Sequence, residues 1–316
     1  MAINADKPQL WKADISESVD LFNSWFMNFA PKAYRETRIE TTRDVEKSLE
    51  LTKDLTAITA EVLKAYPGVL PTLRMATCPP LARDRLIGLA YANKNLVLKM
   101  ELGVIPLRMP AENLKKNLES ISKIISKMLD HDIFPWLEAG KSATDAERHR
   151  ASTIVADRLC GAVSDPIIRN AQERRQLAYI KEHLEKKGYQ HKAHPADQPI
   201  TSMEPGTFSF RMNIVVGDDH KVNIPVDAVI QPKVLHRSRL PLLVEAKSAG
   251  DFTNTNKRRK EEAIKISQLR KKYGNDTQFI LFLCGYFDSG YLGYEAAEGI
   301  DWVWEHRIDD LDKFGL

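Results

Sequence analysis

The sequence has few cysteines, no long hydrophobic run and no large excess of charge of either sign. Its 3 cysteines among 316 residues are widely separated and have no histidine partners at zinc-binding spacing, so neither a disulfide framework nor a structural zinc site is expected. The longest apolar run, Phe279 to Cys284, is too short to cross a bilayer, and the N-terminus lacks the basic start and apolar stretch of a signal peptide. These absences predict reduced thiols, no membrane anchor and a cytoplasmic location.

The formal net charge of +3 is too small to indicate a polyanionic partner, but the basic residues are unevenly distributed. Eight of them, against two acids, lie between Lys257 and Lys272. Such a segment suits the neutralisation of phosphates, although most charge runs are solvated helix faces. If Asn256 caps a helix here, four basic residues fall in its first turn, where the helix dipole disfavours cations. We therefore favour an anion bound at this turn over the alternative, in which Glu261 and Glu262 pair with basic residues along the helix.

Two short segments carry the residues that point to chemistry, namely two carboxylates and a lysine. Asp227 ends a stretch in which apolar and polar residues alternate as in a strand. Glu245 and Lys247 are two residues apart, so they project from one face of a second strand, and adjacent strands would bring all three side chains together. Carboxylates hold a hard cation through oxygen, and such a cation activates water and neutralises charge on a phosphate. The set therefore indicates metal-dependent phosphodiester hydrolysis.

A glutamate and a lysine at this spacing usually mark nothing more than an exposed strand face. Here, however, the pair ends the mostly apolar run from Leu240 to Ala246, which predicts a strand with a buried face. Two charges at the end of a core strand require a partner or a function, because an isolated buried charge is strongly unfavourable.

A helix is predicted upstream of these strands. Asp165 suits its N-cap, Pro166 its first position, and Gly188 a left-handed residue that ends it. Its apolar positions are Leu177, Ile180 and Leu184.

Glu173 is a third candidate carboxylate on this helix. It lies four residues before Leu177 and is therefore predicted to face the core, beside the metal. The alternative places it at the edge of the apolar positions, paired with Arg169 or Arg174.

Two segments of the C-terminal half resemble the type II restriction endonucleases of the XamI-like family, which are PD-(D/E)xK nucleases. They are residues 245–263, EAKSAGDFTNTNKRRKEEA, and residues 285–295, GYFDSGYLGYE. The N-terminal half resembles the same family more diffusely. One departure from the motif is that Val226, and not Pro225, directly precedes Asp227. That proline is variable across such folds.

The resemblance implies a role for each candidate residue. Asp227 and Glu245 would bind Mg²⁺, and Lys247 would orient and help deprotonate the attacking water. Glu173 would support a second metal ion or the lysine. Attack in line with the leaving 3′ oxygen would leave a 5′ phosphate and a 3′ hydroxyl.

The order of elements predicts an α/β (α+β) fold. The first half is mostly helical, with amphipathic stretches near residues 42–65 and 111–130 and a helix that begins at the capping box of Thr144 and Glu147. From about residue 200 a hairpin, the strand of Glu245, the basic helix and the apolar strand 278–284 follow. This order suits a PD-(D/E)xK core of a mixed sheet flanked by helices. We assign residues 1–150 to a helical region for dimerisation or DNA clamping, and residues 151–316 to the nuclease domain.

The predicted function is that of a type II restriction endonuclease that cuts both strands of duplex DNA at a short, palindromic site. Symmetric cutting implies a homodimer, because a two-fold protein matches a two-fold site. A DNA methyltransferase would belong to the same system, without direct contact. Residues able to contact bases or phosphates are Asn254, Asn256, Lys257, Arg258, Arg259, Arg237 and Arg239.

Two other functions stay open at this point. A repair or recombination nuclease of the same fold would share the catalytic residues but recognise DNA structure. A non-catalytic DNA-binding or helical interaction protein would carry the same carboxylates as ordinary surface charges.

Overall fold

The computed structural model describes residues 2–195, 198–217, 222–234, 240–253 and 255–316, with the backbone alone for residues 255–259. The chain forms two compact units, one made of Met1–Phe29 with Arg169–Leu316 and the other of Ala30–Ile168. Helices α1 (Pro8–Leu51) and α8 (Asp145–Lys186) contribute residues to both units. The boundary predicted at residue 150 falls inside α8, and the first 29 residues join the C-terminal unit. The tasks assigned to the two halves stay a prediction.

The C-terminal unit is built on one sheet of six strands in the order β1-β2-β3-β4-β5-β6. The strands are β1 (Gln190–His191), β2 (Thr207–Val216), β3 (Val222–Ile230), β4 (Leu242–Ala249), β5 (Phe279–Gly285) and β6 (Asp301–Trp304). β2, β3 and β4 pair antiparallel, whereas β4, β5 and β6 pair parallel and β1 is parallel to β2. The predicted mixed sheet is confirmed.

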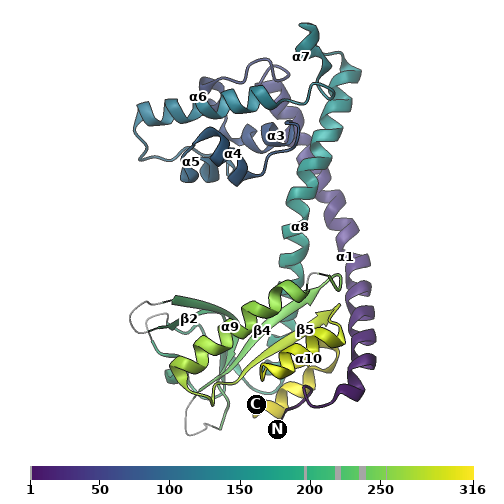
Figure 1. Ribbon diagram of the computed structural model, residues 1–316, viewed down its shortest axis with the longest axis vertical. Helices are drawn as coiled ribbons and strands as arrows, with labels where there is room; N and C mark the ends of the chain where they lie inside the picture. The colour runs from purple at the N-terminus through teal and green to yellow at the C-terminus, as the bar shows by residue number, and fades with distance from the viewer. Residues whose placement is uncertain (1, 196–197, 218–221, 235–239, 254) are drawn as a thin grey trace. The chain divides into compact units, whose positions relative to one another are not determined.

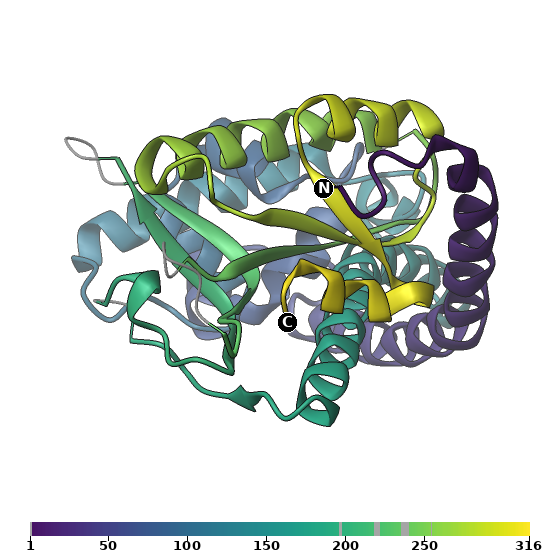
Figure 2. The same cartoon turned by 90° about the horizontal axis from the view of Figure 1, so that it is seen from below.

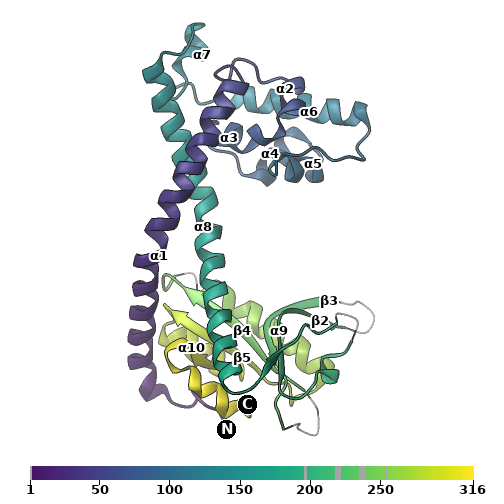
Figure 3. The same ribbon diagram turned by 180° about the vertical axis from the view of Figure 1, so that it is seen from behind.

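Helices cover both faces of this sheet (Figures 1 and 2). The helices that connect the parallel strands are α9 (Thr255–Tyr273) and α10 (Ser289–Ala297), and the C-terminal segment is the 3₁₀ helix η3 (Glu305–Phe314). Ile266 and Leu269 of α9 pack with Leu243 and Leu281 on one face, together with Trp11 of α1. On the other face the partners are α8 and η3 (Figure 3). Charged side chains of α9 can therefore reach one face of the strands.

Alternate residues of the central strands face the two helical layers, as the pleat of a strand requires. Leu243 belongs to the core on the α9 side, and its neighbours Leu242 and Val244 belong to the core on the α8 side. Leu177, Ile180 and Leu184 of α8 are buried in that second core, as predicted.

The helix predicted to begin at Asp165 is the C-terminal part of the longer helix α8. This start is wrong, because α8 begins at Asp145 and continues through Pro166. The capping box that opens α8 is confirmed: the Thr144 backbone N–H donates to Glu147 Oε2 at 2.9 Å, and the Glu147 N–H donates to Thr144 Oγ1 at 3.2 Å. A proline inside a helix removes one backbone hydrogen bond, and buried side chains on both sides of it hold the helix together. Gly188, with φ +80°, follows the helix as predicted.

The unit of Ala30–Ile168 is helical and has its own core. Its shorter elements are α2 (Ala60–Ala65), η1 (Pro67–Val69), α3 (Leu70–Met75), α4 (Arg83–Ala90), α5 (Lys94–Met100), α6 (Ala111–Met128) and α7 (Pro135–Ala139). The prediction of a helix near 111–130 is confirmed by α6. The stretch near 42–65 is not one helix, because α1 ends at Leu51 and three left-handed residues follow: Lys53, Asp54 and Leu55.

A hydrogen bond and an ion pair stabilise this turn. The indole of Trp136 donates to the backbone oxygen of Asp54 at 2.8 Å, and Arg148 binds the Asp54 carboxylate at 2.7 Å. The remaining short element is η2 (Ile200–Ser202), in the proline-containing loop before β2. Among the described residues, none of the helices combines the length and the apolar composition needed to span a bilayer.

Candidate active site

The candidate site lies where β3 and β4 stop pairing. The two strands pair from Ile230↔Leu242 to Ala228↔Val244, and the next residues are Asp227 on β3 and Glu245 on β4. Here a side chain replaces the backbone partner, because Asp227 Oδ2 accepts a hydrogen bond of 2.8 Å from the Ala246 N–H. The Asp227 carboxylate therefore lies against the residue between Glu245 and Lys247.

Glu245 and Lys247 project to the same side of β4, as their spacing predicts. Lys247 Nζ lies 3.3 Å from Glu245 Oε1. The Glu245 residue is only 7% exposed, and its second oxygen, Oε2, has no hydrogen-bond partner within the described part of the chain. A buried carboxylate oxygen without a partner is unfavourable unless a cation binds it.

Helix α9 adds two charged residues to this pair. Lys247 Nζ lies 2.6 Å from Glu262 Oε1, closer than it lies to Glu245. Lys265 Nζ lies 2.6 Å from Glu245 Oε1 and donates to the Pro225 oxygen at 3.2 Å. The charges thus alternate along one line, Glu262, Lys247, Glu245 and Lys265.

Sequence reasoning missed the place of Glu262, which it assigned only to pairs along its own helix. The Glu262 side chain is completely buried. A signal was present in the sequence, because Glu262 precedes the buried residues Ile266 and Leu269 by four and seven positions. This is the spacing of one helix face.

Glu173 does not face the core as predicted. Its side chain is 36% exposed and binds Arg211 of β2 at 2.9 Å, so its partner is neither Arg169 nor Arg174. The buried positions of α8 continue back from Ile180 through Gln176 and Gln172, each four residues apart, and this spacing turns Glu173 towards the helix edge.

Gln176 occupies the position on α8 that faces the strands. Its side-chain amide donates to the backbone oxygens of Lys247 and Phe282, each at 3.3 Å. α8 therefore supports the backbone of β4 at the lysine, while Glu173 acts on the site through its charge.

Electrostatics in the site reflect burial and the crowding of carboxylates. Burial, the largest cause, and the nearby charges of Glu245 and Glu173 together raise the pKa of Asp227 to about 6, against the lowering effects of the Ala246 N–H and Lys247. Burial lowers the pKa of Lys247, but Glu245 and Glu262 outweigh burial and leave that pKa above its ordinary value. The lysine is therefore charged at neutral pH.

Helix α10 carries a further buried carboxyl group, Glu295, close enough to Glu262 to be affected by its charge. Burial, the largest cause, and the nearby charge of Glu262 together raise the pKa of Glu295 to about 8. At neutral pH Glu295 is mainly protonated.

The donor atoms of the site fit a hard divalent cation. Asp227 and Glu245 offer carboxylate oxygens, the ligand type that Mg²⁺ prefers. The unpartnered Oε2 of Glu245 and the raised pKa of Asp227 both show negative charge that a cation would stabilise.

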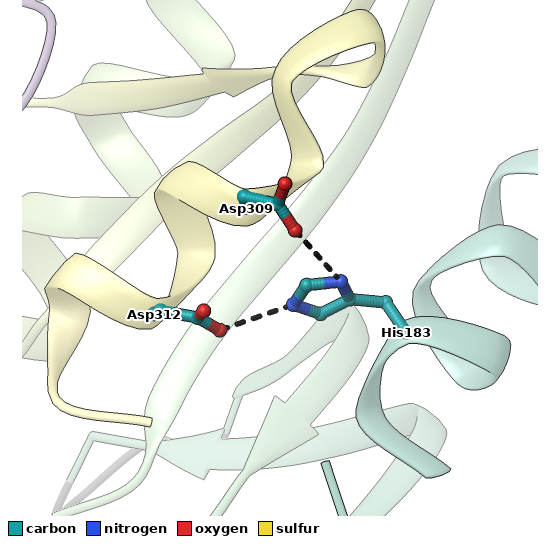
Figure 4. A group of neighbouring side chains, drawn as sticks. All are labelled: His183, Asp309 and Asp312. Carbon is teal, nitrogen blue, oxygen red and sulfur yellow. Dashed lines mark hydrogen bonds and ion pairs between the residues drawn. The ribbon is translucent and has the colours of Figure 1, made fainter. Parts of the chain in front are cut away.

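A second group with metal-ligand side chains joins α8 to η3 (Figure 4). His183 Nε2 lies 3.1 Å from Asp312, and Nδ1 lies 3.6 Å from Asp309. The carboxylates therefore face different ring nitrogens, whereas a metal ion binds one nitrogen and gathers its ligands around it. Lys187 also binds Asp312 at 2.5 Å. The group is best explained as a set of ion pairs.

The predicted DNA-contacting residues are only partly described. Arg237, Arg239 and Asn254 lie outside the described residues. Four others, Asn256, Lys257, Arg258 and Arg259, lie at the start of α9, where the backbone alone is described. Because α9 begins at Thr255, Asn256 is inside the helix and does not cap it.

Known proteins resemble this chain along most of its length. The sequence profile of a family described as XamI restriction endonuclease matches residues 53–304. "Type II restriction enzyme SalI" of Streptomyces albus G is 58% identical over 313 residues, which cover 99% of each chain. A solved structure, protein VC1899 from Vibrio cholerae, is 11% identical with a TM-score of 0.28 and covers 90% of this chain and 55% of that one. So low a TM-score says nothing about the site.

Proposed function

Because this chain belongs to the XamI restriction endonuclease family, we propose that it is a type II restriction endonuclease that cuts both strands of duplex DNA at a short palindromic site. The relative from Streptomyces albus G carries the name of such an enzyme and aligns with nearly the whole chain. Family membership favours this function over a repair nuclease of the same fold.

One observation carries the proposal at the level of residues. The carboxylate of Asp227 accepts a hydrogen bond from the residue that separates Glu245 from Lys247, at 2.8 Å. An aspartate from one strand and a Glu-x-Lys pair from the next are thereby held side by side at the point where the strands separate. An ordinary pair of surface charges would need neither the burial nor this bond.

Asp227 and Glu245 would hold the metal ion. When bound there, a divalent cation such as Mg²⁺ would activate water and neutralise the charge that develops on the phosphate. The Ala246 N–H orients Asp227, leaving its other oxygen for the ion.

Lys247 orients the attacking water and helps to deprotonate it. Its ammonium is held between Glu245 and Glu262 and stays charged, so a water beside it loses a proton more readily. Glu173 supports a second metal ion or the lysine, since its charge acts on Asp227. In-line attack would leave a 5′ phosphate and a 3′ hydroxyl.

Duplex DNA would lie against the basic start of α9, and a second copy of the chain would cut the other strand. Lys257, Arg258 and Arg259 are proposed to contact phosphates or bases together with Asn254, Asn256, Arg237 and Arg239. A methyltransferase of the same system would protect cellular DNA, and the enzyme would act in the cytoplasm.

The test is digestion of unmethylated phage DNA by the purified protein, with and without Mg²⁺. We expect discrete fragments that form only with Mg²⁺. In Lys247→Ala the rate of cleavage should fall by at least about 100-fold. Lys181→Ala is the matched control, because Lys181 is a half-exposed lysine in an (i, i+4) pair on α8. Intact DNA with the wild-type protein, or a preference for branched DNA over defined sites, would contradict the proposal.

A further inference from the structure

We propose that Glu262 is a positioning residue that fixes the ammonium of Lys247 in the catalytic site. The inference rests on the proposed function for the role of Lys247, but the contact itself stands on the geometry of α9 and β4. Helix α9 would then position the catalytic lysine, in addition to presenting basic residues at its start.

The contact between the two residues is short and largely buried. Lys247 Nζ lies 2.6 Å from Glu262 Oε1 and 3.3 Å from Glu245 Oε1. The side chain of Glu262 is completely buried, and that of Lys247 is 13% exposed. Water that reaches the exposed part of Lys247 therefore does not reach the Glu262 carboxylate.

Helix α9 holds Glu262 rigidly in this place. Ile266 and Leu269, on the same face of α9, are buried against strand residues such as Leu281 and Leu283. These apolar contacts fix the position and rotation of α9 over the strands. If Lys247 moved, the Glu262 carboxylate could not move with it.

The stability of the fold alone does not explain a buried charge at this position. Replacing a buried ion pair by apolar residues of similar volume is often neutral or stabilising, because desolvation offsets the attraction of the charges. The buried residues that follow on the same face, Ile266 and Leu269, are apolar. A charged residue next to the catalytic lysine is therefore better explained by a task at the lysine.

Glu262 is needed because Glu245 already has a second lysine partner. Lys265 already binds Glu245 Oε1 at 2.6 Å, so two ammonium groups share one oxygen. Without Glu262, Lys247 would have only Glu245 as a described ion-pair partner and would move closer to it. Glu262 draws Lys247 away and leaves Glu245 available to the metal ion and Lys247 available to the water.

The test compares Glu262→Gln with wild type in kcat and KM for cleavage of a duplex that contains the site. Gln keeps size and a hydrogen-bonding oxygen but removes the charge. We expect kcat to fall about 100-fold, as for a misplaced catalytic group, with KM changed less than about threefold. Glu262→Asp, which keeps the charge but shortens the reach, should retain more activity than Gln.

Glu261→Gln is the matched control, because it makes the same chemical change at the neighbouring, exposed position of α9. It should leave kcat unchanged. Thermal unfolding of all variants checks the fold. If the fall in kcat of Glu262→Gln is accompanied by a lower unfolding temperature, and Glu262→Asp recovers neither, Glu262 has a structural role and the proposal is overturned.

A second measurement does not depend on DNA cleavage. Mass spectrometry follows the acylation of Lys247 by an amine-reactive reagent in the free protein. The reaction should be several-fold faster in Glu262→Gln than in wild type and unchanged in Glu261→Gln. Equal rates in wild type and Glu262→Gln would overturn the proposal. If wild type cuts no DNA, the proposed function fails, while the acylation rates still decide whether Glu262 holds Lys247.

Discussion

The C-terminal unit buries four glutamate side chains, and each of them needs a partner or a proton to offset the loss of solvation. Glu245, Glu262, Glu295 and Glu305 are each at most 7% exposed. Lys247, Lys265 and Arg175 neutralise three of them, with Arg175 Nη1 lying 2.6 Å from Glu305. Glu295 differs, because it is neutralised by a proton.

Glu295→Gln should make the protein less sensitive to alkaline pH. The pKa of Glu295 is about 8 in the folded protein, against 4.5 for a free side chain. The folded state therefore holds a proton that the unfolded state has lost, and the contribution of Glu295 to stability falls as pH rises from about 4.5 to about 8. Gln is neutral at every pH and avoids this loss.

The measurement is urea unfolding at pH 5 and pH 8.5. Relative to wild type, Glu295→Gln should gain free energy of unfolding between these values, at most about 1.4 kcal/mol for each unit of the pKa difference. Glu46→Gln, the same chemical change at an exposed position of α1, should show no such trend. A constant difference between Glu295→Gln and wild type across this range would refute the prediction.

Residues whose role depends on the local pattern could be predicted, and residues whose role depends on packing could not. Glu245 and Lys247 share a strand face through their spacing alone, and the strand that carries Asp227 is adjacent in the sheet. Glu262 reaches Lys247 only because α9 crosses back over β4, which no spacing within α9 reveals. The prediction for Glu173 is wrong because it counts back four residues from Leu177, whereas the buried positions count back from Ile180 through Gln176 and Gln172.

At the scale of elements, the ends of β4 and β5 depend on one glycine. Gly285 ends β5 with φ +104°, opposite Ala249 of β4. A Cβ at this position would lie 2.1 Å from the Ala249 oxygen, and the Gly285 N–H donates to Ser18 Oγ at 2.7 Å. Backbone, and not a movable side chain, fills the space. This explains why glycine opens the segment GYFDSGYLGYE.

Gly285→Ala should therefore destabilise the sheet by about 3 kcal/mol or more, from left-handed strain together with the clash. Gly274→Ala separates the two causes, because Gly274 has φ +93° but nothing within 4 Å of the added Cβ. It should cost only the strain, about 1 to 2 kcal/mol. Urea unfolding measures both, and equal losses would show that the contact with Ala249 has no effect.

Elements were predicted well where a strong local signal marked their ends. The capping box fixed the start of α8 at Thr144, and Gly188 marked its end. Asp165 and Pro166 gave an equally plausible local start, but the helix continues through them, because a single lost hydrogen bond does not outweigh packing on both sides. The end of α1 at Leu51 depends on the bond from Trp136, 82 positions from Asp54, and so had no local signal.

At the scale of the whole molecule, the proposed function requires two active sites for one DNA duplex. We expect the protein to sediment with twice the mass of one chain when bound to a duplex that contains its palindromic site. Duplexes with the site scrambled serve as the control for unspecific binding. A single chain bound per duplex at saturation would argue against symmetric cutting by a homodimer.

The sheet-containing unit is discontinuous in the chain. Its first segment, Met1–Phe29, is separated from Arg169–Leu316 by the whole helical unit. Trp11 packs against Trp302, with ring centroids 5.5 Å apart, and the Asn4 side chain donates to the Trp302 oxygen at 2.8 Å. Contacts so distant in sequence close a long loop, and the entropic cost of that closure slows their formation.

This arrangement has a consequence for a cell that synthesises the protein. On the ribosome, the segment before Phe29 emerges before its partners near residue 302 have been translated. The strand β5, which pairs with β4 at Glu245↔Leu281, also leaves the ribosome after β4. A nascent chain that stops before β5 therefore lacks the strand that pairs with β4 at Glu245, and under the proposed function it should cut no DNA.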